Sequence, residues 1–134
     1  MNNSLAKLLA TENITVQVGN YNTARFDIKS RVLGLPDWKD MSKDVEDLFI
    51  GHEVGHALFT PYEGWHDSPE KLEGCPRSYI NVVEDARIEK NIKSKYPGLV
   101  GPMARGYTSL VAKEFFGDLT DIDWDNVKLI DKIN

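Results

Sequence analysis

The stretch from Lys43 to Phe59 constrains the fold of this 134-residue chain more than any other part of it. Ser42 precedes it and is a favourable helix N-cap, and two acids follow in the first turn, near the positive end of the helix dipole. Pro61 ends the helix at Phe59 or Thr60, because the residue before a proline disfavours helical backbone. We therefore expect a helix of about four to five turns. Its apolar side chains, expected to enter the core, are Val45, Leu48, Phe49, Ala57 and Phe59.

The same stretch contains His52, Glu53 and His56 in the motif His-Glu-x-x-His. Side chains four residues apart lie on one face of a helix, so both imidazoles can bind one zinc ion. The glutamate between them can then reach a water molecule on the metal. The motif predicts the core of a zinc peptidase site. The competing interpretation is a helical scaffold in which two buried histidines bind no metal.

A zinc site of this kind needs a third protein ligand. His66 follows in the chain, but the extended motif with a glycine and a third histidine soon after the second is not met. Glu84 lies in an apolar helical stretch, residues 80–89, where a carboxylate is costly to bury unless it is paired or bound to metal. We predict Glu84 as the third ligand, with its neighbour Asp85 as the alternative.

In the predicted enzyme, zinc lowers the pKa of its bound water toward ~7 and Glu53 acts as the general base. Glu53 then passes the proton to the leaving amine. A further donor usually holds the developing oxyanion. We predict His66 for this catalytic role, because it lies in the loop between the two ligand helices. The other candidates are Arg77, Tyr79 and Tyr107.

The N-terminal third predicts a small sheet. A short helix is expected over residues 2–10, followed by alternating apolar and polar residues over 14–18 and again over 25–29. Turn-forming residues between the two alternating segments predict a hairpin. Residues 32–36 are expected to complete the sheet, and the segment 24–28 could offer a free edge on which an extended peptide substrate pairs.

The C-terminal half predicts mainly helix. Residues 61–77, rich in proline and glycine, are expected to form a long loop with a helical turn near 70–73. Helices are expected over about 78–95 and 102–116, and Asp123 could cap a last one. The predicted fold class is therefore α+β, mainly helical, with a small N-terminal antiparallel sheet or hairpin packed on the motif helix.

Composition and charge limit the number of domains, the kinds of partner and the cellular location that the chain can have. With 41% hydrophobic and 28% charged residues, the chain is expected to form a single domain over 1–134, either complete or the N-terminal part of a longer protein. The net charge of -5, without a cluster of basic residues, argues against a nucleic-acid partner. The single cysteine and the lack of a signal peptide favour the cytoplasm. No apolar run reaches the ~20 residues of a membrane-spanning helix.

Three segments carry a resemblance to a known family. They are His52–Thr60 (HEVGHALFT), Asn81–Glu89 (NVVEDARIE) and Lys95–Leu99 (KYPGL), followed by Gly106 and Tyr107. These segments resemble the N-terminal part of phage-encoded metallopeptidases, which often carry a von Willebrand factor A-like domain and are related to cobalt-chelatase-associated proteins. More broadly, the arrangement resembles the gluzincin group of zinc peptidases.

The resemblance implies a zincin-like fold, a peptide or protein substrate and a place in a larger phage or host assembly, in the host cytoplasm for a phage protein. It also implies His52, His56 and Glu84 as zinc ligands and Glu53 as the catalytic acid/base. Many gluzincins have an aspartate four residues after the ligand glutamate, where this chain has Ile88. The expected function is zinc-dependent peptide hydrolysis. The alternative is a zinc-binding interaction or regulatory module without proteolytic activity.

Overall fold

A computed structural model describes residues 3–65, 68 and 72–117 of the chain. It confirms the predicted α+β, mainly helical class. The strands are β1 (Thr15–Gly19), β2 (Arg25–Asp27) and β3 (Val32–Pro36). The helices are α1 (Asn3–Ala10), α2 (Lys43–Phe59), α3 (Tyr62–Trp65), α5 (Arg77–Lys95), the 3-10 helix η1 (Pro97–Leu99) and α6 (Val100–Gly117).

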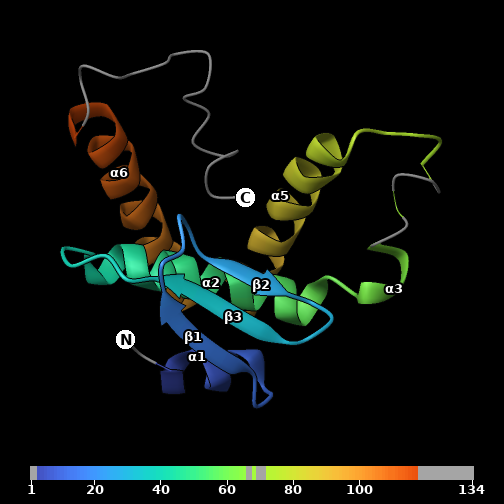
Figure 1. The fold of residues 1–134 in the computed structure, drawn as a ribbon, viewed down its shortest axis with the longest axis horizontal. Coiled ribbons are helices and arrows are strands. Elements are labelled where there is room, and N and C mark those ends of the chain that lie inside the picture. The colour runs from blue at the N-terminus through green and yellow to red at the C-terminus, as the bar shows by residue number, and fades with distance from the viewer. Residues whose placement is uncertain (1–2, 66–67, 69–71, 118–134) are drawn as a thin grey trace.

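The three strands form a mixed sheet in the order β1-β3-β2 (Figure 1). The predicted hairpin between the first two strands is therefore wrong, and the predicted antiparallel pairing holds only for β2 and β3. β3 runs parallel to β1, with Thr15 opposite Val32, and antiparallel to β2, with Phe26 opposite Leu33. The physical reason lies in β3, whose residues are almost all buried, whereas β1 and β2 are largely exposed. A nearly continuous apolar strand takes the central position, where both of its edges are paired.

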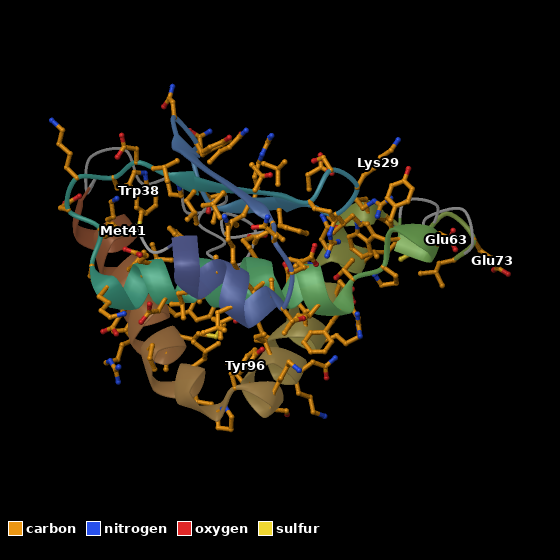
Figure 2. All side chains as sticks on the ribbon, turned by 90° about the horizontal axis from the view of Figure 1, so that it is seen from below. Lys29, Trp38, Met41, Glu63, Glu73 and Tyr96 are labelled. Carbon is orange, nitrogen blue, oxygen red and sulfur yellow. The ribbon has the colours of Figure 1, made fainter. Side chains whose placement is uncertain are left out.

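Helix α2 lies at the centre of the molecule (Figure 2). The sheet covers one side of it, and α5 and α6 cover the other, while α1 packs across it beside the sheet. Of the apolar positions predicted to enter the core, four are buried and Phe59 is partly buried against them. Trp38, which precedes α2, packs on the core through an edge-to-face contact with Phe49, with ring centroids 5.5 Å apart.

The ends of α2 follow the predicted capping. The Ser42 hydroxyl oxygen accepts a hydrogen bond from the backbone N–H of Val45 at 3.2 Å. At the other end, the N–H of Thr60 donates to the carbonyl of His56, and the backbone then leaves the helix before Pro61. Both histidines of the motif therefore lie in the last two turns of a well-capped helix.

Two glycines let neighbouring helices approach α2 closely. A Cβ on Gly55 would lie 2.8 Å from Cδ1 of Ile88, so α5 packs against α2 between the two motif histidines. A Cβ on Gly106 would lie 2.6 Å from the carbonyl oxygen of Asp44, so α6 packs equally close to the first turn of α2. Such contacts fix the distance and rotation of both helices relative to α2.

The helices predicted for the C-terminal half agree with the structure where its residues are described. α5 and α6 begin at Arg77 and Val100, close to the predicted starts, and α6 follows directly on η1. The predicted turn near 70–73 falls partly, and the helix from Asp123 wholly, outside the described residues. Within the described part of the chain, no helix is long and apolar enough to cross a membrane.

Candidate metal centre

Helices α2 and α5 bring His52, His56 and Asp85 together. Asp85 Oδ1 lies 2.9 Å from His56 Nε2 and 3.2 Å from His52 Nε2. One donor atom of each residue lies within 4.8 Å of the others. Asp85 reaches this position because α5 turns the face carrying Ile80, Ile88 and Ile92 toward the interior, and Asp85 lies on the same buried side.

Two of these residues, His52 and Asp85, have buried polar atoms without a well-formed hydrogen bond among the described residues. His52 is 1% exposed, and neither of its ring nitrogens has a hydrogen-bond partner among the described residues. Oδ2 of Asp85 is buried and unpaired in the same way. Because nearly all buried polar atoms in proteins are bonded, these unsatisfied atoms mark a group of side chains that could hold a cation.

Two of the distances between these donors are compatible with a shared metal ion, zinc included. Tetrahedral zinc with ligand bonds near 2.0–2.1 Å places neighbouring ligand atoms roughly 3.3 Å apart. The two observed distances from Asp85 Oδ1 to the histidine nitrogens, 2.9 and 3.2 Å, are close to that value. Two imidazoles and one carboxylate also form a ligand set typical of catalytic zinc.

The charges around His52 oppose the effect of its burial. Burial lowers the pKa of His52. Its contacts with Asp85 and Glu89 and the charge of Glu53 raise the pKa by more than burial lowers it, so the net value is about 10. Without a metal ion, these contacts favour the protonated form of His52. A divalent cation would take the place of that proton.

Glu53 is buried beside the two histidines and lines a cavity of about 170 Å³ with them. Burial raises the pKa of Glu53, while the charges of His52 and His56 lower it and Asp85 raises it again, for a net rise. A carboxylate with a raised pKa accepts a proton more readily, as a general base must.

Glu84 makes different contacts from those predicted for a ligand. Its carboxylate accepts hydrogen bonds from Arg87 at 2.5 and 2.8 Å and from the hydroxyl of Thr60 at 2.6 Å. Burial raises the pKa of Glu84, but these bonds with Arg87 and Thr60 lower it below the usual value. The arrangement puts the alternative, Asp85, at the two histidines, and Glu84 as a ligand stays a prediction.

A second acid on α5, Glu89, lies near His52, and the sequence analysis did not predict it. Glu89 Oε2 lies 3.7 Å from His52 Nδ1, and the hydroxyl of Tyr107 on α6 donates to Glu89 at 2.7 Å. The available signal was spacing, because Glu89 lies four residues after Asp85 on the same helical face. If Asp85 is the ligand, Glu89 is the acid four residues after it, at the position where Glu84 as ligand would have Ile88.

The remaining predicted site residues are dispersed. Tyr79 is 67% exposed, Arg77 donates to the carbonyl of Trp65, and Tyr107 bonds Glu89; none of the three lines the cavity. His66 lies outside the described residues, and its catalytic role stays a prediction. Beside the metal-site residues, the cavity is lined by Ala24, Arg25, Phe26, Ile28, Thr60, Trp65 and Asn81.

Comparisons with known proteins give no relationship for this chain: no family model, no curated protein and no solved structure matches it.

Proposed function

We propose that this protein is a zinc-dependent peptidase in which His52, His56 and Asp85 hold the metal. The observation that carries the proposal is the convergence of these three donors beside Glu53, with both ring nitrogens of buried His52 lacking a well-formed hydrogen bond to any described residue. The motif's spacing and the acid of a second helix support the same donor set. Zinc bound here would act as a Lewis acid on a carbonyl and lower the pKa of a bound water toward ~7.

The chain's own residues have separate tasks in this reaction. Glu53, buried beside both histidines, would take a proton from the attacking water and return it to the leaving amine. Asp85 neutralises charge at the histidines without serving as the base, because its contacts with them oppose the effect of burial and lower its pKa. The Asn81 amide lines the same cavity and is a donor for the developing oxyanion.

The sheet supports a peptide as the substrate. Among the described strands β2 pairs only with β3, so its other edge is free, and Ala24, Arg25 and Phe26 line the cavity with Glu53. An extended peptide can add to such an edge by backbone hydrogen bonds. A peptide bound along the segment 24–28, which we predicted as a free edge, would pass beside the cavity that contains Glu53. Its scissile bond could then reach the proposed metal.

The test separates metal binding from catalysis. We expect purified protein to contain close to one zinc per chain and to cleave members of a mixed peptide library. Glu53→Gln should keep the zinc but lose about 10²- to 10⁴-fold in cleavage rate, since it removes the general base and no ligand. His52→Ala combined with His56→Ala should remove the zinc.

Two results would contradict the proposal in different ways. Zinc retained by the double histidine variant would show that the metal binds elsewhere. Zinc at full occupancy, with no cleavage of any peptide by the wild-type protein, would favour the zinc-binding interaction or regulatory module over the peptidase.

A further inference from the structure

Thr60 links the proposed metal centre to Glu84. Its hydroxyl oxygen lies 3.0 Å from His56 Nδ1 and 2.6 Å from Glu84 Oε2, and both Thr60 and Glu84 are buried. Thr60 occupies the C-cap of α2, so the same residue that ends the helix also contacts the last histidine of the motif. The chain of contacts continues from Glu84 to Arg87.

The chemistry of these groups fixes the direction of each hydrogen bond. Arg87 is always a donor, and Glu84 paired with it is an ionised carboxylate that can only accept. The single hydroxyl proton of Thr60 therefore goes to Glu84. The Thr60 oxygen is then left as an acceptor, so His56 Nδ1 must carry the proton of that contact.

The other nitrogen of the same ring consequently faces the proposed metal. With its proton on Nδ1, a neutral His56 has a lone pair on Nε2, and that nitrogen lies 2.9 Å from Asp85 Oδ1. A lone pair and a carboxylate oxygen repel each other at this distance unless a cation or a proton lies between them. Outer hydrogen bonds that fix the tautomer of a ligand histidine are a common support of zinc sites.

We propose that Thr60 and Glu84 form a positioning pair that holds His56 with Nδ1 protonated and Nε2 presented to the metal. Arg87 anchors the pair, because it bonds both oxygens of Glu84 and also donates to the carbonyl of Phe59 at the end of α2. This inference rests on the proposed metal site, and it gives Glu84 a role outside the ligand set.

The experiment measures zinc affinity and the metal-bound nitrogen separately. Zinc is titrated into metal-free wild type, Thr60→Val and Thr60→Ser against a chelating indicator. We expect Thr60→Val to lose about 10- to 100-fold in affinity, the usual effect of removing such an outer partner, and Thr60→Ser, which keeps the hydroxyl, to stay close to wild type. Thr108→Val is the matched control, because that hydroxyl bonds its own helix at Ala104, away from the metal centre.

Nitrogen NMR of ¹⁵N-histidine-labelled, zinc-loaded protein shows which ring nitrogen of His56 binds zinc and which one keeps its proton. A purely structural role of Thr60 makes no prediction about this choice. In the wild type, we expect His56 to bind zinc through Nε2 and to keep a proton on Nδ1. The unfolding midpoint of each metal-free variant reports whether the substitution has disturbed the fold.

The outcomes are distinguishable. A wild-type protein that binds no zinc would overturn the proposed function itself. Zinc binding with unchanged affinity in Thr60→Val, or through Nδ1 of His56 in the wild type, would overturn the positioning pair and leave the metal site standing. Weak binding by Thr60→Val, rescued in Thr60→Ser, supports it.

Discussion

Three acids on one helix differ in what their carboxylates contact. Asp85 meets both motif histidines, Glu89 faces His52 alone, and Glu84 is bonded to Arg87 and the threonine at the end of α2. A carboxylate already satisfied by a guanidinium gains less from a metal than one with a buried unpaired oxygen. At the residue scale, this contrast distinguishes the proposed ligand Asp85 from the proposed supporting residue Glu84.

Asp85→Asn should therefore weaken zinc binding far more than Glu84→Gln does. The first change removes the charge of the acid that lies against both histidines, whereas the amide oxygen introduced by the second can still accept the hydrogen bond from Thr60. We expect Asp85→Asn to lose stoichiometric zinc and Glu84→Gln to lose affinity by about 10-fold or less. Zinc content after dialysis checks this, and the reverse order would assign the third ligand to Glu84.

The pKa of His52 predicts how the metal-free protein responds to pH. Its folded value of about 10 exceeds the unfolded value of 6.5, so the protonated histidine stabilises the fold fully below pH 6.5, and that stabilisation is lost as the pH rises to 10. Urea unfolding in the presence of a chelator should show stability falling over this interval. His52→Gln, which does not titrate, should flatten the profile; an equally steep fall in that variant would sink the assignment.

At the scale of elements, the site depends on how closely α5 and α6 pack on α2. Gly55 admits Ile88 between the two motif histidines, and Gly106 admits the first turn of α2. In both places the missing side chain allows the helices to approach. The position of Asp85 relative to the histidines follows from this packing, because a small rotation of α5 would move it away.

Gly106→Ala should destabilise the protein even though alanine favours a helix. Its Cβ would lie 2.6 Å from a backbone oxygen and 2.7 Å from Cβ of Leu48, so α6 would have to move. We expect a loss of about 1–3 kcal/mol in the free energy of unfolding. Gly101→Ala on the same helix meets only the flexible end of Arg105 and should instead gain about 0.5–1 kcal/mol. Denaturant unfolding compares the two, and equal effects would contradict the close contact.

For the molecule as a whole, the proposed metal joins the central helix to α5, which are far apart in the sequence. The sheet and α1 cover α2 from the other side (Figure 2). The cavity at the site is lined from β2, α2 and α5, so it lies where the sheet and the helical layer meet on α2. A metal ion there would link residues that otherwise leave buried polar atoms unpaired. Binding should therefore stabilise the whole fold.

Zinc should raise the free energy of unfolding by about 2.7 kcal/mol when its free concentration is about 100-fold above Kd. Thermal unfolding with zinc and then with excess chelator measures the difference. The variant carrying both His52→Ala and His56→Ala should show no zinc-dependent gain. A gain of equal size in that variant would mean that the stabilisation arises from another site.

The local features of the site could be predicted from the sequence. A capping serine, helical spacing of apolar residues and a proline fix α2, so that His52 and Glu53 are buried and His56 is half-buried on the same helix. These properties depend on neighbours within a few residues. The central position of β3 was also readable, since Val32–Pro36 is nearly all apolar, but turn residues favoured the hairpin instead.

Only the tertiary structure decided which acid meets the histidines. Glu84 and Asp85 are adjacent, and neighbouring positions on a helix point about 100° apart, so helical pattern alone leaves both open. The rotation of α5, set by Ile88 packed against Gly55, turns Asp85 to the histidines and Glu84 to Thr60 at the end of α2. The motif by itself brought two histidines and a glutamate onto one helix; long-range packing decided which acid lies beside them and which groups bond the second histidine.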